Sequence, residues 1–144
     1  MKKIYIFLFS LIIFSSCSKD EDEVIFNISL INTYPIEIVE FQENIYVRLF
    51  YQHPEGFIGF SDPDYLSLEV KDSRLTQADY YHIIPVTPPD NSLSVTGELL
   101  VEIDSPFLFG NADMETLRFL IRIQDTKMNW SNQVTTPDII INRE

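Results

Sequence analysis

The sequence contains a single cysteine, Cys17, and only two histidines, His53 and His82, among its 144 residues. A lone cysteine has no partner for a disulfide within the chain, so the fold has to be stable without one. The two histidines do not have the spacing of a metal-binding pair, and the sequence has no Gly-x-Ser-x-Gly elbow and no glycine-rich phosphate loop. We therefore expect neither a catalytic centre nor enzyme activity.

Basic residues are also scarce. The chain has 10 Lys and Arg against 22 Asp and Glu, which gives a formal charge of −12. Proteins bind nucleic acid and anionic headgroups largely by neutralising phosphate charge. A charge of this sign excludes nucleic acid as a partner and still permits cationic partners. With so many acids, a pair of carboxylates alone does not indicate a glycoside hydrolase.

Long hydrophobic runs are missing as well, since a transmembrane helix needs about 20 apolar residues. The N-terminal run from Ile4 to Phe14 is shorter; it follows two lysines and precedes the small residues Ser15 and Ser16. A basic start, a short apolar segment and small residues form the three-part pattern of a secretory signal peptide. We predict that residues 1–16 are a signal peptide.

Cys17 follows the small residues directly, as the modified cysteine does in bacterial lipoproteins. Residues 14–17 resemble a lipobox, although serine replaces the more common alanine or glycine before the cysteine. The resemblance implies a covalent lipid on Cys17 and no other cofactor. Two or more acyl chains hold a protein on a bilayer where one chain does not. The alternative is an ordinary signal peptide that leaves a free thiol.

Residues 18–23 contain one serine, one lysine and four acids. This segment resembles the signal that exports lipoproteins of Bacteroidetes-type bacteria to the outer leaflet of the outer membrane. The residues that match the signal are Ser18, Lys19, Asp20 and Glu21. Like charges also repel one another and keep such a segment extended, so residues 17–23 are expected to act as a tether. The expected location is the outer membrane, with the body of the protein at the cell surface.

The remaining residues, 24–144, form one domain in this interpretation. No window in them keeps a helical period of 3.6 residues, whereas apolar and polar residues alternate in short segments. The segments with this pattern are 26–30, 36–40, 45–51, 66–71, 80–84, 95–103, 117–123 and 139–141. About seven to eight such strands predict an all-β fold, specifically an antiparallel sandwich of immunoglobulin or fibronectin type III character. A small closed barrel is the alternative.

Four stretches of the body together carry a second resemblance: Gly56–Phe60, Leu68–Arg74, Asp125–Asn132 and Val134–Pro137. They resemble a family of uncharacterised immunoglobulin-like outer-membrane lipoproteins of the same bacterial group. The resemblance covers most of the body. It implies the sandwich fold and carries no assigned activity.

Relatives in that family often have an acidic loop at the position of residues 52–59, which suits an oxygen-ligated cation. Here the loop contains one acid, Glu55, and Asp62 and Asp64 lie nearby in the sequence. Calcium takes six to eight oxygen ligands. These three residues are the only candidates for a metal site, and we expect no bound metal.

Residues 125–132 are expected to form a tight turn in which Asp and Asn side chains accept hydrogen bonds from backbone N–H groups. Met128 stands where that turn would favour glycine, and Trp130 is expected to cover the end of the core. A tryptophan can also stack on a sugar. Gly97, inside the expected strand 95–103, predicts a bulge or a close backbone approach.

Two expected strands have notable outward faces. Tyr46 and Phe50 flank an arginine on one, and in an immunoglobulin-like order this face would lie beside residues 98–102. Cross-strand ion pairs account for most arginines on such faces. Clustered exposed apolar side chains tend to mark an interaction surface. The outward residues of the second strand, which would lie beside residues 67–71, are Arg118, Leu120 and Arg122.

These features together indicate a non-catalytic, surface-anchored accessory subunit of an outer-membrane protein complex. Its expected partners are the bilayer, through the acyl chains, and a protein of the same membrane. The alternative is a surface module that binds a glycan, with Trp130, Tyr46 or Phe57 as the stacking residue.

Overall fold

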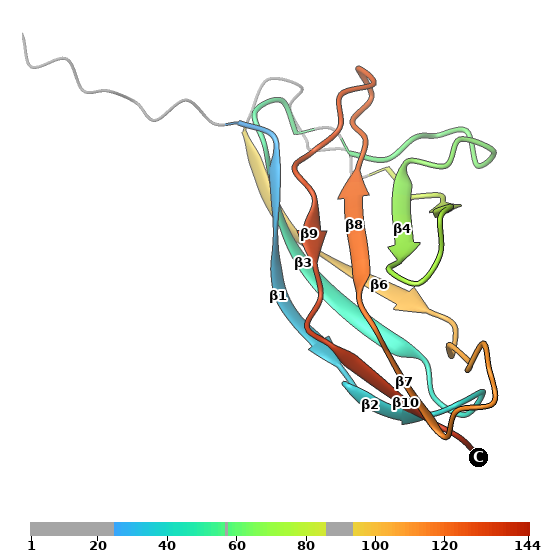
Figure 1. Ribbon diagram of the computed structural model, residues 1–144. Coiled ribbons are helices and arrows are strands. Elements are labelled where there is room, and N and C mark those ends of the chain that lie inside the picture. Colours follow the sequence, from blue (N-terminus) through green and yellow to red (C-terminus); the bar gives the residue numbers. More distant parts are fainter. Residues whose placement is uncertain (1–24, 57, 86–93) are drawn as a thin grey trace, which may run out of the picture.

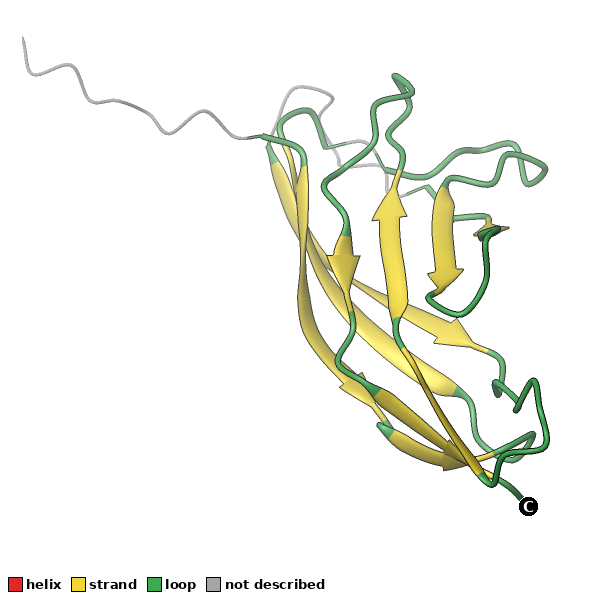
Figure 2. Ribbon diagram, viewed as in Figure 1, coloured by secondary structure: helices red, strands yellow, loops and turns green. Residues whose placement is uncertain are grey.

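The computed structural model describes residues 25–56, 58–85 and 94–144 of the chain. These residues form ten β-strands and no helix, which confirms the all-β class (Figures 1 and 2). The immunoglobulin-like sandwich stays a prediction. Among the described residues, no helix is long and apolar enough to cross a membrane. Cys17, the export signal at 18–21 and Phe57 lie outside the described residues.

The strands form three small sheets. The first is antiparallel with the order β1-β3-β6, and the second is antiparallel with the order β5-β4-β8-β9. In the third, β2-β10-β7, strand β2 runs parallel to β10. The bounds are β1 (Asn27–Tyr34), β2 (Glu37–Val39), β3 (Ile45–His53), β4 (Leu68–Asp72), β5 (Asp79–Tyr81), β6 (Val95–Ile103), β7 (Met114–Leu117), β8 (Phe119–Ile123), β9 (Val134–Thr135) and β10 (Ile139–Asn142).

Side chains from all three sheets form one buried hydrophobic cluster. Every second residue of β3 is buried, as the two-residue period of a strand predicts. β8 and β10 contribute in the same way, each with inward isoleucines. Isoleucine and valine favour strands because their branched side chains pack well on a pleated surface, so the residues that form the strands also fill the core.

The segment 117–123, expected as one strand, is divided at Arg118. Leu117 ends β7, which pairs with β10, and Phe119 begins β8, which pairs with β4. The backbone N–H of Arg118 donates to Ser73 Oγ at 2.9 Å instead of to a strand neighbour. Leu117 and Phe119 are both buried, so the alternation continues across the break while the hydrogen-bond partners change. Periodicity alone therefore does not reveal the change of sheet.

Two apolar residues assigned to strand faces are exposed. Ile36 and Leu66 lie one and two residues before the strands that follow them, β2 and β4, and both side chains face solvent. The sequence also did not predict β9, the parallel pairing of β2 with β10, or the bulge near Ile31 in β1.

The expectation for Gly97 is partly right. It pairs directly with Tyr51 in a regular β3–β6 ladder, so it does not form a bulge. The close approach is real, but it comes from a side chain, because a Cβ atom on Gly97 would collide with the Tyr51 ring.

The two ends of the molecule carry different segments (Figure 1). The described chain starts at Ile25 at the upper end, beside the loops that connect β3 to β4 and β8 to β9. The opposite end carries the turn between β2 and β3, the loop 104–113 between β6 and β7, and the C-terminus.

Candidate interaction surface

The strand pairing predicted for the Tyr46 face is confirmed. Tyr46, Arg48 and Phe50 of β3 lie opposite Glu102, Leu100 and Glu98 of β6. The Tyr46 hydroxyl donates to Glu102 Oε1 at 3.1 Å, and Arg48 forms a long ion pair of 3.9 Å with Glu98. Leu100 is the exposed apolar residue on the β6 side. This face therefore combines aromatic and apolar side chains with polar contacts between the two strands.

The second face has the predicted neighbours at two of its three residues, since Arg122 lies opposite Glu69 and Leu120 opposite Lys71. Arg118 lies outside β8, and its backbone N–H donates to Ser73, beyond residues 67–71. The Arg122 guanidinium donates twice to the Glu69 carboxylate, at 2.8 and 2.7 Å. Arg118 forms an exposed ion pair with Asp138. The two arginines of this face are thus engaged within the chain, and Leu120 is half-buried.

Trp130 is half-buried, and it pairs with Gln124 through an isolated bridge. The guanidinium of Arg122 lies 4.4 Å from the centre of its ring. A cation over the ring face is a favourable arrangement. One face of the Trp130 ring is therefore covered by Arg122 and is not free to stack on a sugar.

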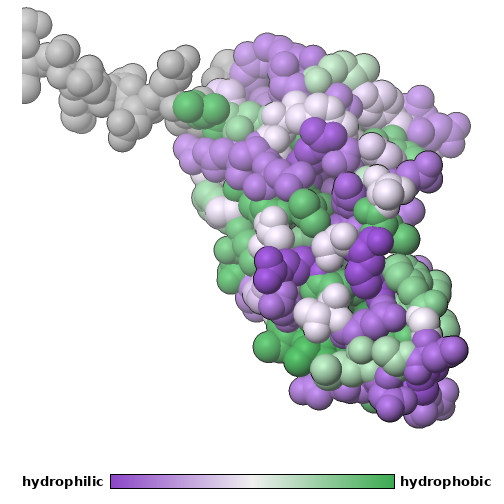
Figure 3. Space-filling view, viewed as in Figure 1, coloured by the Kyte–Doolittle hydropathy of each residue, from purple (hydrophilic) through white to green (hydrophobic). Residues whose placement is uncertain are grey.

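The most exposed aromatic cluster among the described residues lies elsewhere, at residues that were not predicted as a site. Phe41, Phe107 and Phe109 are 67%, 45% and 47% exposed and lie at the end opposite Ile25. Phe107 stacks on Phe41 with ring centres 5.4 Å apart, and it meets Phe109 edge-on at 5.4 Å. We call these three residues the aromatic tip. On one face of the molecule, green hydrophobic patches recur toward this end between purple polar ones (Figure 3).

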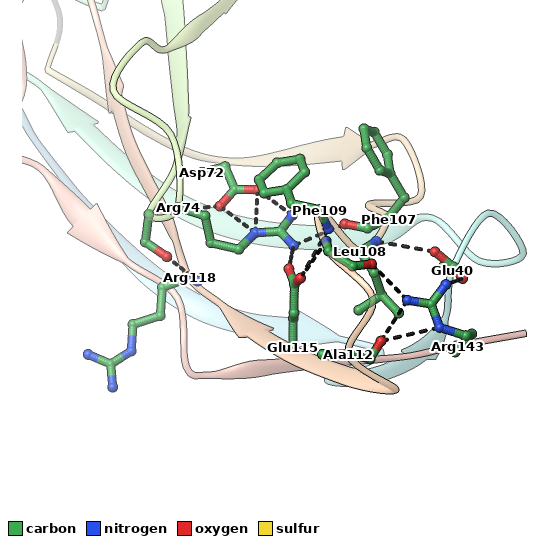
Figure 4. Close-up of polar contacts among 12 residues, drawn as sticks. Glu40, Asp72, Arg74, Phe107, Leu108, Phe109, Ala112, Glu115, Arg118 and Arg143 are labelled. Atoms are coloured by element: carbon green, nitrogen blue, oxygen red, sulfur yellow. Dashed lines mark hydrogen bonds and ion pairs between the residues drawn. The ribbon is translucent and has the colours of Figure 1, made fainter.

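Arg74, from the turn after β4, holds the loop that carries two of the three phenylalanines (Figure 4). Its Nε and Nη2 donate to the Asp72 carboxylate, with the shortest contact at 2.7 Å. Its Nη1 donates to Glu115 Oε2 at 2.7 Å and to the backbone oxygen of Phe107 at 3.0 Å. The guanidinium also lies 4.1 Å from the centre of the Phe109 ring. One arginine therefore fixes both the backbone and a ring of the loop.

The other side of the loop is held by Glu40 and Arg143. The buried carboxylate of Glu40 accepts the backbone N–H of Leu108 at 3.2 Å. Arg143 forms an ion pair with Glu40 at 3.4 Å and donates to the backbone oxygens of Gly110 and Ala112 at 2.8 and 2.7 Å. The Leu108 side chain is buried in the core between its two exposed phenylalanine neighbours. The loop is thus held from Phe107 to Ala112 by contacts with Arg74, Glu40 and Arg143.

Phe41 reaches the tip from the turn between β2 and β3. Its backbone has φ of 63°, in the left-handed region that non-glycine residues rarely adopt. The N–H of the next residue, Gln42, donates to Val39 O at 3.2 Å and closes the turn. A large apolar residue therefore occupies a strained, exposed position, which is a feature that stability alone does not favour.

Glu115 connects Arg74 to the loop backbone. Burial alone would raise the pKa of Glu115, but hydrogen bonds from Arg74 and from the N–H groups of Gly110 and Phe109 hold it below the ordinary value. The ionised carboxylate is the form that accepts these bonds. The Glu115 interactions therefore stabilise the fold fully when the pH is above the ordinary carboxyl pKa of 4.5. This stabilisation is lost as the pH falls through the lowered pKa that Glu115 has in the folded protein.

This gives a pH-dependent prediction for Glu115→Gln. At neutral pH the variant should unfold at lower denaturant concentration than the parent, because it lacks the charge that pairs with Arg74. As the pH falls from 4.5 through the lowered pKa of the folded parent, Glu115 becomes protonated and the difference between the two proteins should shrink. Denaturant titrations of both proteins over a pH series measure this. A difference that stays constant down to acid pH would show that the Glu115 charge does not contribute.

The three metal candidates are not brought together. Glu55 accepts a hydrogen bond from Lys127 Nζ at 2.7 Å, and Asp62 accepts the backbone N–H of Asp64 at 3.0 Å as a turn-forming residue. Within residues 25–56, 58–85 and 94–144, no group of three or more His, Cys, Asp or Glu side chains is arranged to hold a metal ion.

Comparison of the chain with protein-family models, with curated proteins and with solved structures finds no match. The resemblance to immunoglobulin-like lipoproteins therefore stays a prediction from sequence. The candidate site depends on the geometry of this chain alone.

One sequence signal for the tip was present. The segment 105–113 lies between the expected strands 95–103 and 117–123, and it contains Phe107-Leu108-Phe109. An apolar triplet in a loop that turns its middle residue inward leaves the two flanking residues outside. The contribution of Phe41 had no such signal, because its neighbours in the tip are distant in the sequence.

Proposed function

We propose that this chain is a non-catalytic lipoprotein of the outer membrane that acts as an accessory subunit by binding another protein through the aromatic tip. In this proposal Cys17 carries the acyl chains, residues 18–21 direct the protein to the cell surface, and the body is an immunoglobulin-like sandwich. The protein partner is a component of the same membrane.

The exposed phenylalanines on a clamped loop are the observation that supports this proposal. Aromatic residues are enriched in the energetically dominant parts of protein interfaces. Ordering a flexible loop on binding costs affinity, and a loop already held by Arg74, Glu115 and Arg143 avoids much of that cost. A clamped loop that only served the core would not need two exposed rings, nor a third ring, from Phe41, packed against them.

The position of the tip supports the same function. The described chain begins at Ile25, at the end of the molecule opposite the aromatic tip (Figure 1). A lipid anchor at Cys17 would join the body from that side. The tip would then point away from the point of attachment, toward other proteins at the surface.

Affinity purification of the full-length tagged chain from crosslinked native membranes tests the proposal. The parent should recover one partner in a stoichiometric amount. The double variant Phe107→Ser, Phe109→Ser should recover at least tenfold less, because it removes the two rings of the loop and leaves Leu108 in the core. The matched control is Leu66→Ser with Ile84→Ser, two exposed residues away from the tip, which should recover as much as the parent.

Two results would contradict the proposal. One is recovery of the lipoprotein alone after crosslinking. The other is equal recovery by the tip variant and the control. Binding of the parent to a glycan panel, in the absence of any protein partner, would support the glycan alternative instead.

A further inference from the structure

A pocket of about 370 Å³ opens beside the aromatic tip. Phe107 and Phe109 line one part of it, and Leu75 and Tyr81, from the segment that includes β5, line another. A pocket at the small end of the ligand-site range is large enough for one long side chain. Because it shares two residues with the tip, a protein bound there would also cover the pocket.

Two carboxylates of this pocket have no partner within the described chain. Asp79 of β5 and Asp104, directly after β6, line the pocket, and neither makes a hydrogen bond or an ion pair through its side chain with a described residue. Burial raises the pKa of the Tyr81 hydroxyl, and the charges of Asp79 and Asp104 raise it further. Both carboxylates therefore act on the same point, the Tyr81 hydroxyl.

The one arginine of the pocket does not neutralise these charges. Arg74 directs Nε and Nη2 to Asp72 and Nη1 to Glu115 and to a backbone oxygen (Figure 4). Its charge is thus matched by two other carboxylates. The pocket combines aromatic walls with an uncompensated negative charge, in a chain whose formal charge is −12.

We propose that this pocket receives an arginine side chain of the protein that binds the aromatic tip. A guanidinium matches it because it stacks on aromatic rings and forms paired hydrogen bonds with carboxylates. The Arg74 guanidinium over the Phe109 ring already shows this kind of contact within the chain. The inference rests on the proposed function. It specifies that the surface of the partner packs on the aromatic tip and carries an arginine beside that contact.

A model ligand tests the pocket without the partner. The full-length, ¹⁵N-labelled chain in detergent micelles is titrated with N-acetyl-arginine amide and, separately, with the citrulline analogue, which has nearly the same shape without the charge. The arginine compound should shift the amide resonances of β5 and of the loop 104–110, and the citrulline compound should bind at least tenfold more weakly. Equal binding of the two compounds, or no shift in these segments, would overturn the proposal.

A charge-neutral variant locates the binding groups. Asp79→Asn with Asp104→Asn should weaken binding of the arginine compound about tenfold. The control is Asp62→Asn with Asp64→Asn, which removes the same charge from an exposed loop outside the pocket and keeps the turn-forming oxygen of residue 62. This control should bind as the parent does. Equal weakening in both variants would mean that net charge alone attracts the ligand, and would also overturn the proposal.

The same variants separate this inference from the proposed function. If membrane crosslinking recovers a partner that depends on Phe107 and Phe109 but not on Asp79 and Asp104, the tip binds a protein and the arginine pocket is wrong. If no partner is recovered, the proposed function fails, and the titration still decides whether the pocket prefers a guanidinium.

Discussion

Replacement of Arg74 by alanine is expected to lower the free energy of unfolding by about 3 kcal/mol. The Arg74 side chain is only 13% exposed, and it pairs with the carboxylates of Asp72 and Glu115, which are 10% and 22% exposed. Removing the cation leaves two largely buried carboxylates without their main partner, which is far more costly than breaking a pair in water. In a domain of this size the melting temperature should fall by roughly 10 °C.

Arg118→Ala is the matched control for this experiment. Arg118 and its partner Asp138 are both about half exposed, at 55% and 54%. Water and salt screen such a pair, so its loss should change the stability much less than the loss of Arg74. Thermal and denaturant unfolding of the two variants measure the difference. Equal losses would show that the Arg74 network does not stabilise the loop.

Arg74→Lys separates charge from geometry. Lysine keeps the positive charge but has no planar fork, so it cannot bind Asp72, Glu115 and the Phe107 backbone at the same time. The variant should lie between the parent and Arg74→Ala in stability. Because the loop would lose a clamp, binding of a partner at the aromatic tip should also weaken. A stability equal to that of the parent would show that charge alone matters here.

The local part of the fold followed from the sequence. In β3, alternate residues are buried, and a shift of one residue would have turned that whole set to the solvent. This constraint explains why the face of Tyr46 and Phe50 lies beside residues 98–102 of β6, as predicted. Leu120 and Arg122 likewise lie beside residues 67–71 as predicted, although the sequence did not fix which residues pair.

The sheet assignment did not follow from the sequence, because it depends on hydrogen bonds between distant segments. Leu117 and Phe119 have the same inward direction, but their strands pair with β10 and with β4. The aromatic tip was missed for the same reason. Its loop is fixed by residues 40, 74, 115 and 143, which no local pattern connects.

The turn after β8 has the local geometry that the sequence predicted, and it makes one further contact. The sequence indicated that Asp125 would accept backbone N–H groups and that Met128 stands in a position suited to glycine. Asp125 Oδ1 accepts the N–H groups of Lys127 and Asn129, each at 2.8 Å. Met128 has φ of 68°, in the left-handed region where glycine is favoured. The local chemistry of this turn was therefore read correctly.

The sequence did not reveal that Asp125 also contacts His53. The Nδ1 atom of His53 accepts the N–H of Glu55 at 3.1 Å, so the ring proton lies on Nε2, which donates to Asp125 Oδ2 at 3.3 Å. Asn129 Nδ2 donates to the same oxygen at 3.1 Å. Burial alone would raise the pKa of Asp125, but the bonds from Asn129, His53 and Lys127 lower it. The carboxylate thus joins the β8–β9 turn to the end of β3.

Replacement of Asp125 by alanine should therefore lower the free energy of unfolding by about 3 kcal/mol, because several donors in a buried site lose their acceptor together. Asp125→Asn should cost less. It keeps one oxygen for the two backbone N–H groups, but its amide nitrogen faces the His53 Nε2 donor. In denaturant unfolding, the parent should be the most stable protein, Asp125→Asn should be less stable, and Asp125→Ala should be the least stable.

Met128→Gly is the control within the same turn. Glycine adopts a positive φ without the strain that a side chain carries, although the unfolded chain also gains freedom. The two effects oppose each other, so this variant should unfold at nearly the same denaturant concentration as the parent. If Asp125→Ala were also as stable as the parent, the buried carboxylate would not hold the turn, and its contacts with His53 and Asn129 would be incidental to the fold.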